Sequence, residues 1–110
     1  MARFIKGDVV IVPFPFSDLT QSKRRPALVI SNLKGNDIIL CQITSQNIYD
    51  GYSIYLKDED FQEGSLKKPS NIRPNRIFTA DVQIILYKAG TLKNEKVEEV
   101  INKIILIIKS

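Results

Sequence analysis

Two short polar segments of this sequence combine residue types that could act on a phosphate group. In the first, Lys23, Arg24 and Arg25 stand immediately before a proline and an apolar run. Guanidinium groups present planar forks of N–H donors that match phosphate oxygens, and the start of a strand would hold them more rigidly than a loop centre. A solvated strand edge that opposes aggregation explains the same cations equally well, so spacing alone leaves both interpretations open.

The second segment follows the apolar run at 38–41 and carries hydroxyl and amide groups. Thr44, Ser45 and Gln46 stand there in succession. Such groups can bind phosphate oxygens and base edges, although strand ends are often rich in Ser and Thr for purely local reasons. This segment alone does not decide between binding and local capping.

A later polar segment at 73–79 adds further cations, with Lys67 and Lys68 shortly before it. Its polar members are Arg73, Asn75, Arg76 and Thr79. If these cations share a face with those at 23–25, the combined patch suits a flexible polyanion such as single-stranded RNA. Phe16, Tyr49 and Tyr52 are the candidates for base stacking, although aromatic residues more often belong to a core or a strand edge.

The sequence has no histidine and a single cysteine, Cys41. Imidazole acids, bases and metal ligands are therefore excluded, as are an intrachain disulfide and a Cys/His zinc site. Cys41 lies in an apolar run, which favours a buried structural thiol in a reduced, intracellular compartment. The acidic stretch 58–63 could bind a metal, but consecutive carboxylates on a turn usually face water. We expect no metal and no cofactor.

The composition predicts one small domain with an anionic partner. The chain has 110 residues, of which 44% are hydrophobic and 25% charged, and a net charge of +4. This length fits a single domain over residues 1–110, and the positive charge favours nucleic acid over a membrane. No secretory signal or membrane-spanning run is evident, so we expect a cytoplasmic protein.

The elements that must position these residues are mostly strands. Apolar and β-branched runs predict strands at 8–14, 27–31, 37–44, 52–56 and 83–87, with one or two short, kinked strands at 70–81. Apolar residues spaced three and four apart predict a C-terminal amphipathic helix with Asn94 as its N-cap. We therefore expect an α+β, mainly β fold, most plausibly a small SH3-like barrel with a terminal helix.

Taken in order, these segments resemble the MazF/PemK (Kid) toxins of bacterial type II toxin–antitoxin systems. The resemblance rests on the stretches 6–10, 14–18, 23–31, 41–45 and 72–81, which are KGDVV, FPFSD, KRRPALVIS, CQITS and IRPNRIFTAD. It covers nearly the whole chain. Each stretch is modest by itself, but their order and intervals are jointly rather specific.

This resemblance implies a MazF/Kid/CcdB-like barrel that forms a homodimer. It further implies a metal-independent endoribonuclease that cuts single-stranded RNA and arrests growth until a cognate antitoxin blocks it. By motif position, Arg25 matches the family's catalytic arginine, and Thr44 matches the threonine that partners it at the scissile phosphate. The expected RNA-binding residues are Phe16, Lys23, Arg24, Ser45, Gln46, Arg73, Asn75, Arg76 and Thr79.

The sequence departs from the family pattern at two positions. Asn75 stands where the PemK branch has a catalytic aspartate, and Phe78 precedes Thr79 where many relatives have arginine. An amide cannot take up a proton at neutral pH. Asn75 therefore keeps an alternative open, namely a barrel of the same fold that does no chemistry and binds RNA or, like CcdB, inhibits a protein target.

Overall fold

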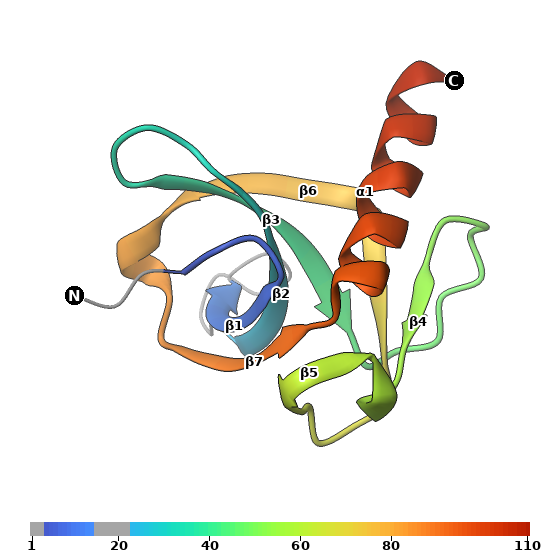
Figure 1. Ribbon diagram of the computed structural model, residues 1–110, viewed down its shortest axis with the longest axis horizontal. Coiled ribbons are helices and arrows are strands. Elements are labelled where there is room, and N and C mark those ends of the chain that lie inside the picture. Colours follow the sequence, from blue (N-terminus) through green and yellow to red (C-terminus); the bar gives the residue numbers. More distant parts are fainter. Residues whose placement is uncertain (1–3, 15–22) are drawn as a thin grey trace.

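Seven strands form one curled sheet that wraps around itself as a half-barrel in the computed structural model, which describes residues 4–14 and 23–110 (Figure 1). The strands are β1 (Asp8–Phe14), β2 (Lys23–Asn32), β3 (Asp37–Thr44), β4 (Ile54–Leu56), β5 (Phe61–Gly64), β6 (Ser70–Asp81) and β7 (Tyr87–Leu92). Their order across the sheet is β4-β6-β3-β2-β1-β7-β5, and every pair of neighbours is antiparallel. The predicted mainly β fold with a terminal helix is confirmed.

Alternation along the central strands divides the buried side chains between two clusters. Val9 and Leu28 belong to one cluster, and Val10 and Ala27, one residue along each strand, belong to the other. Successive residues of a strand point to opposite faces, so both faces of the central sheet are covered. This is why the runs in β1 and β2 are continuously apolar rather than alternating.

The helix α1 (Asn94–Lys109) covers the first of these clusters through Val97, Val100 and Ile104. The predicted helix is confirmed, but its N-cap is Lys93 and not Asn94, which is already helical. Lys93 makes no side-chain capping bond. Over the described part of the chain, no helix has the length and apolar content needed to cross a membrane.

Two local predictions were wrong. Val82–Ile84 is a 3-10 helix, η2, because the Asp81 side chain accepts a hydrogen bond from the Gln83 backbone N–H at 2.8 Å and starts a turn. The partly buried apolar residues of this turn pack on the second cluster, which produces an alternating pattern without a strand. β5 directly follows another 3-10 helix, η1 (Asp58–Asp60), where the sequence indicated only an acidic turn.

A glycine and a buried carboxylate fix the start of β1. Gly7 adopts a left-handed conformation with φ of +99°, which suits glycine. The Asp8 carboxylate accepts hydrogen bonds from the Ile5 backbone N–H and from Thr91 Oγ1, both at 2.9 Å. These contacts join β1 to β7 and so set the register of the two strands that form one side of the site described next.

Candidate active site

An open cleft of about 560 Å³ lies at one end of the sheet, and it is called the basic cleft below. Its lining comes from residue 11 of β1, residues 24–26 of β2, residues 43–45 at the end of β3, residues 65–68 and 70, and residues 87–89 of β7. Five cations are among them, namely Arg24, Arg25, Lys67, Lys68 and Lys88. None of the described lining residues carries a carboxylate.

Strand pairing brings Arg25 and Thr44 together in this cleft. β2 and β3 are antiparallel, and Ala27 pairs with Gln42 at the last matched position. Arg25 lies two residues before Ala27, and Thr44 lies two residues after Gln42. Because the strands are antiparallel, both residues lie beyond this pair at the same end of the sheet. In the described structure, residues 23–26 pair with β1 and not with β3. Pro26 has no backbone N–H to donate, and at this position β3 does not require one.

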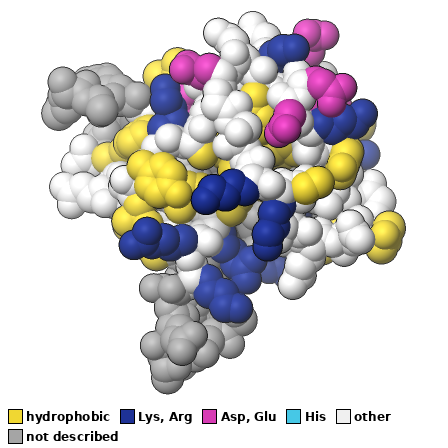
Figure 2. Space-filling view, turned by 90° about the horizontal axis from the view of Figure 1, so that it is seen from below, with side chains coloured by type: hydrophobic (Ala, Val, Ile, Leu, Met, Phe, Trp, Pro, Cys, Tyr) yellow, Lys and Arg dark blue, Asp and Glu magenta, His cyan; other side chains and the backbone are white. Residues whose placement is uncertain are grey.

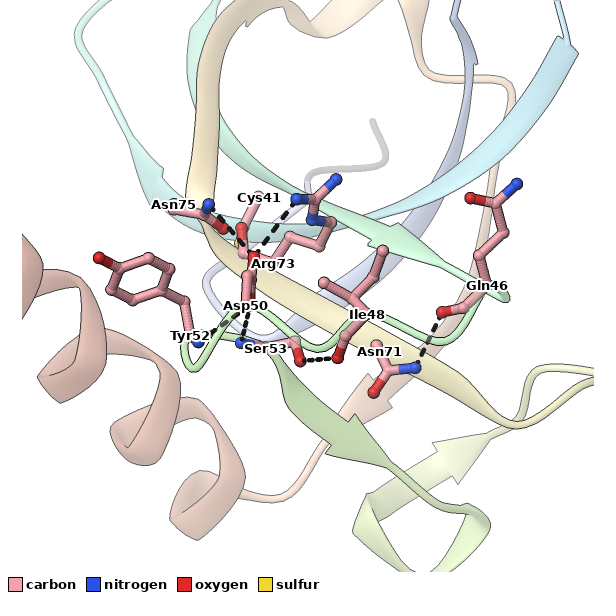
Figure 3. Close-up of polar contacts among 9 residues, drawn as sticks. All are labelled: Cys41, Gln46, Ile48, Asp50, Tyr52, Ser53, Asn71, Arg73 and Asn75. Carbon is pink, nitrogen blue, oxygen red and sulfur yellow. Dashed lines mark hydrogen bonds and ion pairs between the residues drawn. The ribbon is translucent and has the colours of Figure 1, made fainter.

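Thr44 is held by the turn that follows β3. Its side chain is buried, with 4% of the residue exposed, and its hydroxyl oxygen accepts a hydrogen bond from the Gln46 backbone N–H at 3.2 Å. The Gln46 carbonyl in turn accepts a hydrogen bond from Asn71 Nδ2 of β6 at 3.0 Å (Figure 3). Contacts from two neighbouring strands therefore hold Thr44 in the lining of the cleft.

Within residues 4–14 and 23–110, no carboxylate pairs with the cations of the basic cleft. The ion pairs among the described residues join Arg73 to Asp50 and Lys96 to Asp60 and Glu99, so none of them involves a cation of the basic cleft. Figure 2, seen from the side of β5 and β7, shows Lys and Arg side chains gathered near hydrophobic ones, with the acidic side chains towards the upper part of the view. A face of this kind attracts a polyanion.

Arg73 and Asn75 belong to a separate polar cluster around Asp50 (Figure 3). Asp50 Oδ2 accepts hydrogen bonds from Arg73 Nη2 and Asn75 Nδ2, each at 3.4 Å. The pKa of the Asp50 carboxyl lies below its usual value, chiefly because the backbone N–H of Tyr52 donates a hydrogen bond to it. Hydrogen bonds from Ser53 and Arg73 lower it further. Asp50 is therefore ionised at neutral pH and serves as a partner for Arg73 rather than as a strong base.

The other predicted RNA-binding residues lie in different places. Arg24 and Ser45 line the basic cleft, and Lys23 is exposed at the start of β2 beside it. Arg76 and Thr79 are exposed on β6 and do not line the cleft. The cleft thus gathers the first basic segment with Lys67 and Lys68, but not with the two arginines of β6. Phe16 lies outside the described residues.

Sequence reasoning missed the β7 side of the cleft. Tyr87 and Lys88 line it, whereas Tyr49 and Tyr52, the candidates for base stacking, do not. The sequence predicts a strand at 83–87 that ends at residue 87. Instead, residues 82–84 form a 3-10 helix and residue 87 begins β7. The remaining signal, a tyrosine followed by a lysine, is too common to single out a site.

The described residues offer no cluster of three or more Asp, Glu or Cys side chains that could hold a metal ion. Among the described lining residues of the basic cleft, arginine, lysine and hydroxyl side chains are the groups that can donate to a phosphate. The arrangement can bind a phosphate diester and stabilise negative charge that develops on its oxygens.

Comparisons with known proteins agree on one family and one fold. The model of the PemK-like, MazF-like toxins of type II toxin–antitoxin systems matches residues 5–108. The fold is similar to MazF from Deinococcus radiodurans, with a TM-score of 0.79, 18% identity and full coverage of both chains. It is also similar to an endoribonuclease solved with its cognate antitoxin from a mycobacterial species, with a TM-score of 0.77, 11% identity, and 97% and 96% of the two chains covered. No curated protein matches the sequence.

Proposed function

Because the chain belongs to the PemK-like, MazF-like toxins of type II toxin–antitoxin systems, we propose that it is an endoribonuclease that cuts single-stranded RNA in the basic cleft, without a metal ion or cofactor. One observation carries this proposal. Arg25 and Thr44, from two different strands, line one cleft with four further cations and no carboxylate among its described lining residues.

The proposed reaction is attack of a ribose 2′-oxygen on the adjacent phosphorus. The bond from phosphorus to the 5′-oxygen breaks, the 2′-hydroxyl proton leaves to solvent, and the departing 5′-oxygen takes up a proton. The products are a 2′,3′-cyclic phosphate and a 5′-hydroxyl. The step requires alignment of the 2′-oxygen and stabilisation of the extra negative charge on the phosphorane oxygens.

Arg25 and Thr44 supply that stabilisation in our proposal. The Arg25 guanidinium can donate two parallel hydrogen bonds to phosphate oxygens. The Thr44 hydroxyl already accepts one hydrogen bond, from Gln46, and can still donate its own proton to a phosphate oxygen. With no histidine in the chain and no carboxylate among the described cleft residues, the rate relies on these donors rather than on a strong general base.

The biological setting follows from the family. An endoribonuclease from a mycobacterial species is described with its cognate antitoxin, and MazF of Deinococcus radiodurans with MazE. We infer that a cognate antitoxin likewise neutralises this chain, that the chain acts as a homodimer, and that it works in the cytoplasm, where RNA is present and the Cys41 thiol stays reduced.

The test is incubation of the purified protein with a long single-stranded RNA in the presence of EDTA. We expect the wild type to cut the RNA and Arg25→Ala to lose about two to three decades in rate. Arg25→Lys, which keeps the charge but not the planar fork, should stay well below the wild type. Lys34→Ala removes an exposed cation at the turn before β3, outside the cleft, and should cut like the wild type.

Intact RNA with the wild type, or equal cutting by Arg25→Ala, would overturn the proposal. RNA that is bound but never cut would instead support the non-catalytic alternative that Asn75 keeps open. Detection of cyclic phosphate ends by their resistance to ligation, and of free 5′-hydroxyls by labelling with a kinase, checks the chemistry of the step.

A further inference from the structure

We propose that Tyr87 and Lys88 of β7 form a nucleotide subsite in the basic cleft, in which the Tyr87 ring stacks on a base and Lys88 binds the phosphate beside it. The subsite adjoins the phosphate held by Arg25, and in that respect it rests on the proposed function. Its position and chemistry follow from the lining of the cleft and from the pairing of β7 with β1.

A transverse row of paired residues places Tyr87 close to the catalytic arginine. Ile11 of β1 pairs with Pro26 on one side and with Tyr87 on the other, and all three line the cleft. Two interstrand spacings separate the backbones of Pro26 and Tyr87 by roughly 10 Å. Because Arg25 directly precedes Pro26, a nucleotide next to the phosphate at Arg25 reaches the β7 side of the cleft.

The ring of Tyr87 is available for stacking, although its backbone is fixed. The residue is 53% exposed, while Ile11 beside it is buried. The backbone N–H of Leu86 donates to the Ile11 carbonyl at 2.9 Å, which ties the start of β7 to β1. A half-exposed aromatic ring on a fixed strand offers a stacking surface at little conformational cost.

A β-bulge opens β7 at this point. Val9 pairs with Gly90 and Val10 pairs with Lys88, so Ala89 is an extra residue on β7. β5 pairs with β7 only at residues 90–92, which leaves residues 87–89 with β1 as their one sheet neighbour in the described structure. Bulges re-aim side chains at sheet edges and next to binding sites. Here the bulge brings three consecutive residues, 87–89, into the lining of the cleft.

Lys88 supplies the charge that a stacked nucleotide needs. It is exposed, and it takes part in none of the ion pairs found among the described residues. The described lining of the basic cleft contains no carboxylate that would compete with a phosphate for Lys88. A single-stranded nucleic acid that stacks on Tyr87 would therefore meet an uncompensated ammonium group at the next residue.

A second hollow adjoins the basic cleft and contains a tyrosine that can serve as a control. Beyond residues 66–68 lies a second, smaller hollow of about 260 Å³, and Asp58 and Glu59 contribute to its lining. Three lysines also line this hollow, so it carries charges of both signs, whereas the lining of the basic cleft has cations only among the described residues. Tyr55, which is 50% exposed on β4, lines this second hollow and provides a matched control for Tyr87.

The test is binding of a short mixed-sequence RNA that is methylated at every 2′-oxygen, so that it lacks the nucleophile and cannot be cut. Fluorescence anisotropy of a fluorescein label on this RNA gives the affinity. We expect Tyr87→Ala and Tyr87→Leu to bind about tenfold or more weakly, and Tyr87→Phe, which keeps the ring, to stay within about twofold of the wild type. Lys88→Ala should lower the slope of log affinity against log salt by about 0.7.

Two exposed residues outside the cleft serve as controls. Tyr55→Ala and Lys34→Ala should each bind the methylated RNA like the wild type. Far-UV circular dichroism and thermal unfolding identify any variant that has lost its fold. If Tyr87→Ala is destabilised, Tyr87→Leu, which retains apolar bulk without a stacking face, still decides the matter.

The outcomes separate this subsite from the nuclease. Wild-type affinity of both Tyr87→Ala and Tyr87→Leu, or equal losses in Tyr87→Phe and Tyr87→Ala, would overturn stacking at this position. If the wild type binds the methylated RNA through Tyr87 but cuts no RNA, the subsite stands and the nuclease does not. If it cuts RNA and the Tyr87 variants bind and cut equally well, the nuclease stands and the subsite is wrong. A wild type that neither binds nor cuts overturns both.

Discussion

Cys41 lies fully buried on β3, where its thiol contacts the backbone of β6. Its Sγ donates a hydrogen bond to the Arg73 carbonyl at 3.0 Å. Burial raises the pKa of the Cys41 thiol to about 12. Because the thiolate is the reactive form, the native protein holds its one cysteine in an unreactive state.

We predict that thiol reagents reach Cys41 only after unfolding. Labelling by iodoacetamide at neutral pH should be at least about a thousandfold slower in buffer than in concentrated urea, since the unfolded fraction of a small domain is that low or lower. Mass spectrometry of timed samples measures both rates. Equal rates in the two solvents would show that the thiol is accessible in the native state.

The same thiol makes stability depend on alkaline pH. In the unfolded chain it loses its proton at a pKa of about 8.5, whereas the folded chain retains the proton up to about pH 12. The free energy of unfolding should therefore fall as the pH rises through this interval. Urea unfolding at several pH values checks the trend, and Cys41→Ala should show a shallower fall than the wild type.

Helix α1 begins without a side-chain cap. Lys93 occupies the N-cap position. The surface around it is mainly acidic and consists of Glu59, Asp60, Glu95 and Glu99, with Lys96 as a further cation. A serine at residue 93 could accept a hydrogen bond from a free backbone N–H of the first helical turn without adding another negative charge.

We predict that Lys93→Ser is more stable than Lys93→Ala by about 1 kcal/mol, the usual contribution of a capping side chain. Both variants remove the same charge, so their comparison isolates the cap. Urea unfolding followed by circular dichroism measures the difference. Equal midpoints would show that a serine hydroxyl at residue 93 does not cap this helix.

The sequence predicted the elements that bury continuous apolar runs, and it failed where short elements depend on distant partners. β1, β3 and α1 occur close to their predicted bounds, because apolar runs and helical spacing directly encode their burial. β5 contains no β-branched residue, and it pairs with β7 through Gly64 and Gly90. Such a strand forms because a neighbour is available to it, and local propensity does not reveal this.

The candidate site was foreseeable to a similar degree. The motif positions of Arg25 and Thr44 led to the cleft, because adjacent central strands carry both residues. Tyr87 and Lys88 could not be found from their neighbours in the sequence, because they reach the cleft only through a bulge and a register with β1. Asp50, which pairs with Arg73 and Asn75, is likewise brought to them by a turn more than twenty residues earlier in the chain.

Taken as a whole, the molecule concentrates charge on one side. Five cations line the basic cleft, whereas acidic residues gather at the start of α1. The net charge of +4 therefore understates the local potential that RNA would meet at the cleft.

We predict a strong dependence of RNA affinity on salt. Each cation that contacts a phosphate contributes about 0.7 to the slope of log affinity against log salt. If all five cleft cations make such contacts, raising monovalent salt from about 50 to about 200 mM should weaken binding of the methylated RNA about a hundredfold. The double variant Lys67→Ala and Lys68→Ala should reduce the slope by about 1.4. An affinity that does not change with salt would show that the RNA does not use this cleft.

Gly64 ends β5 immediately before the loop 65–68, which contributes to the lining of the basic cleft. A Cβ atom at residue 64 would collide with the Ala89 carbonyl oxygen, and the backbone there has a φ of +75°, so this position tolerates little change. Residues 65–68, just beyond it, are mostly exposed and belong to no strand, while Arg25 and Thr44 lie on the central sheet. Substitutions in this loop can therefore change the part of the cleft lining that the loop contributes and leave Arg25 and Thr44 in place. Under the proposed function, a few changes in this loop would alter which RNA is bound, while the residues proposed to cut it stay the same.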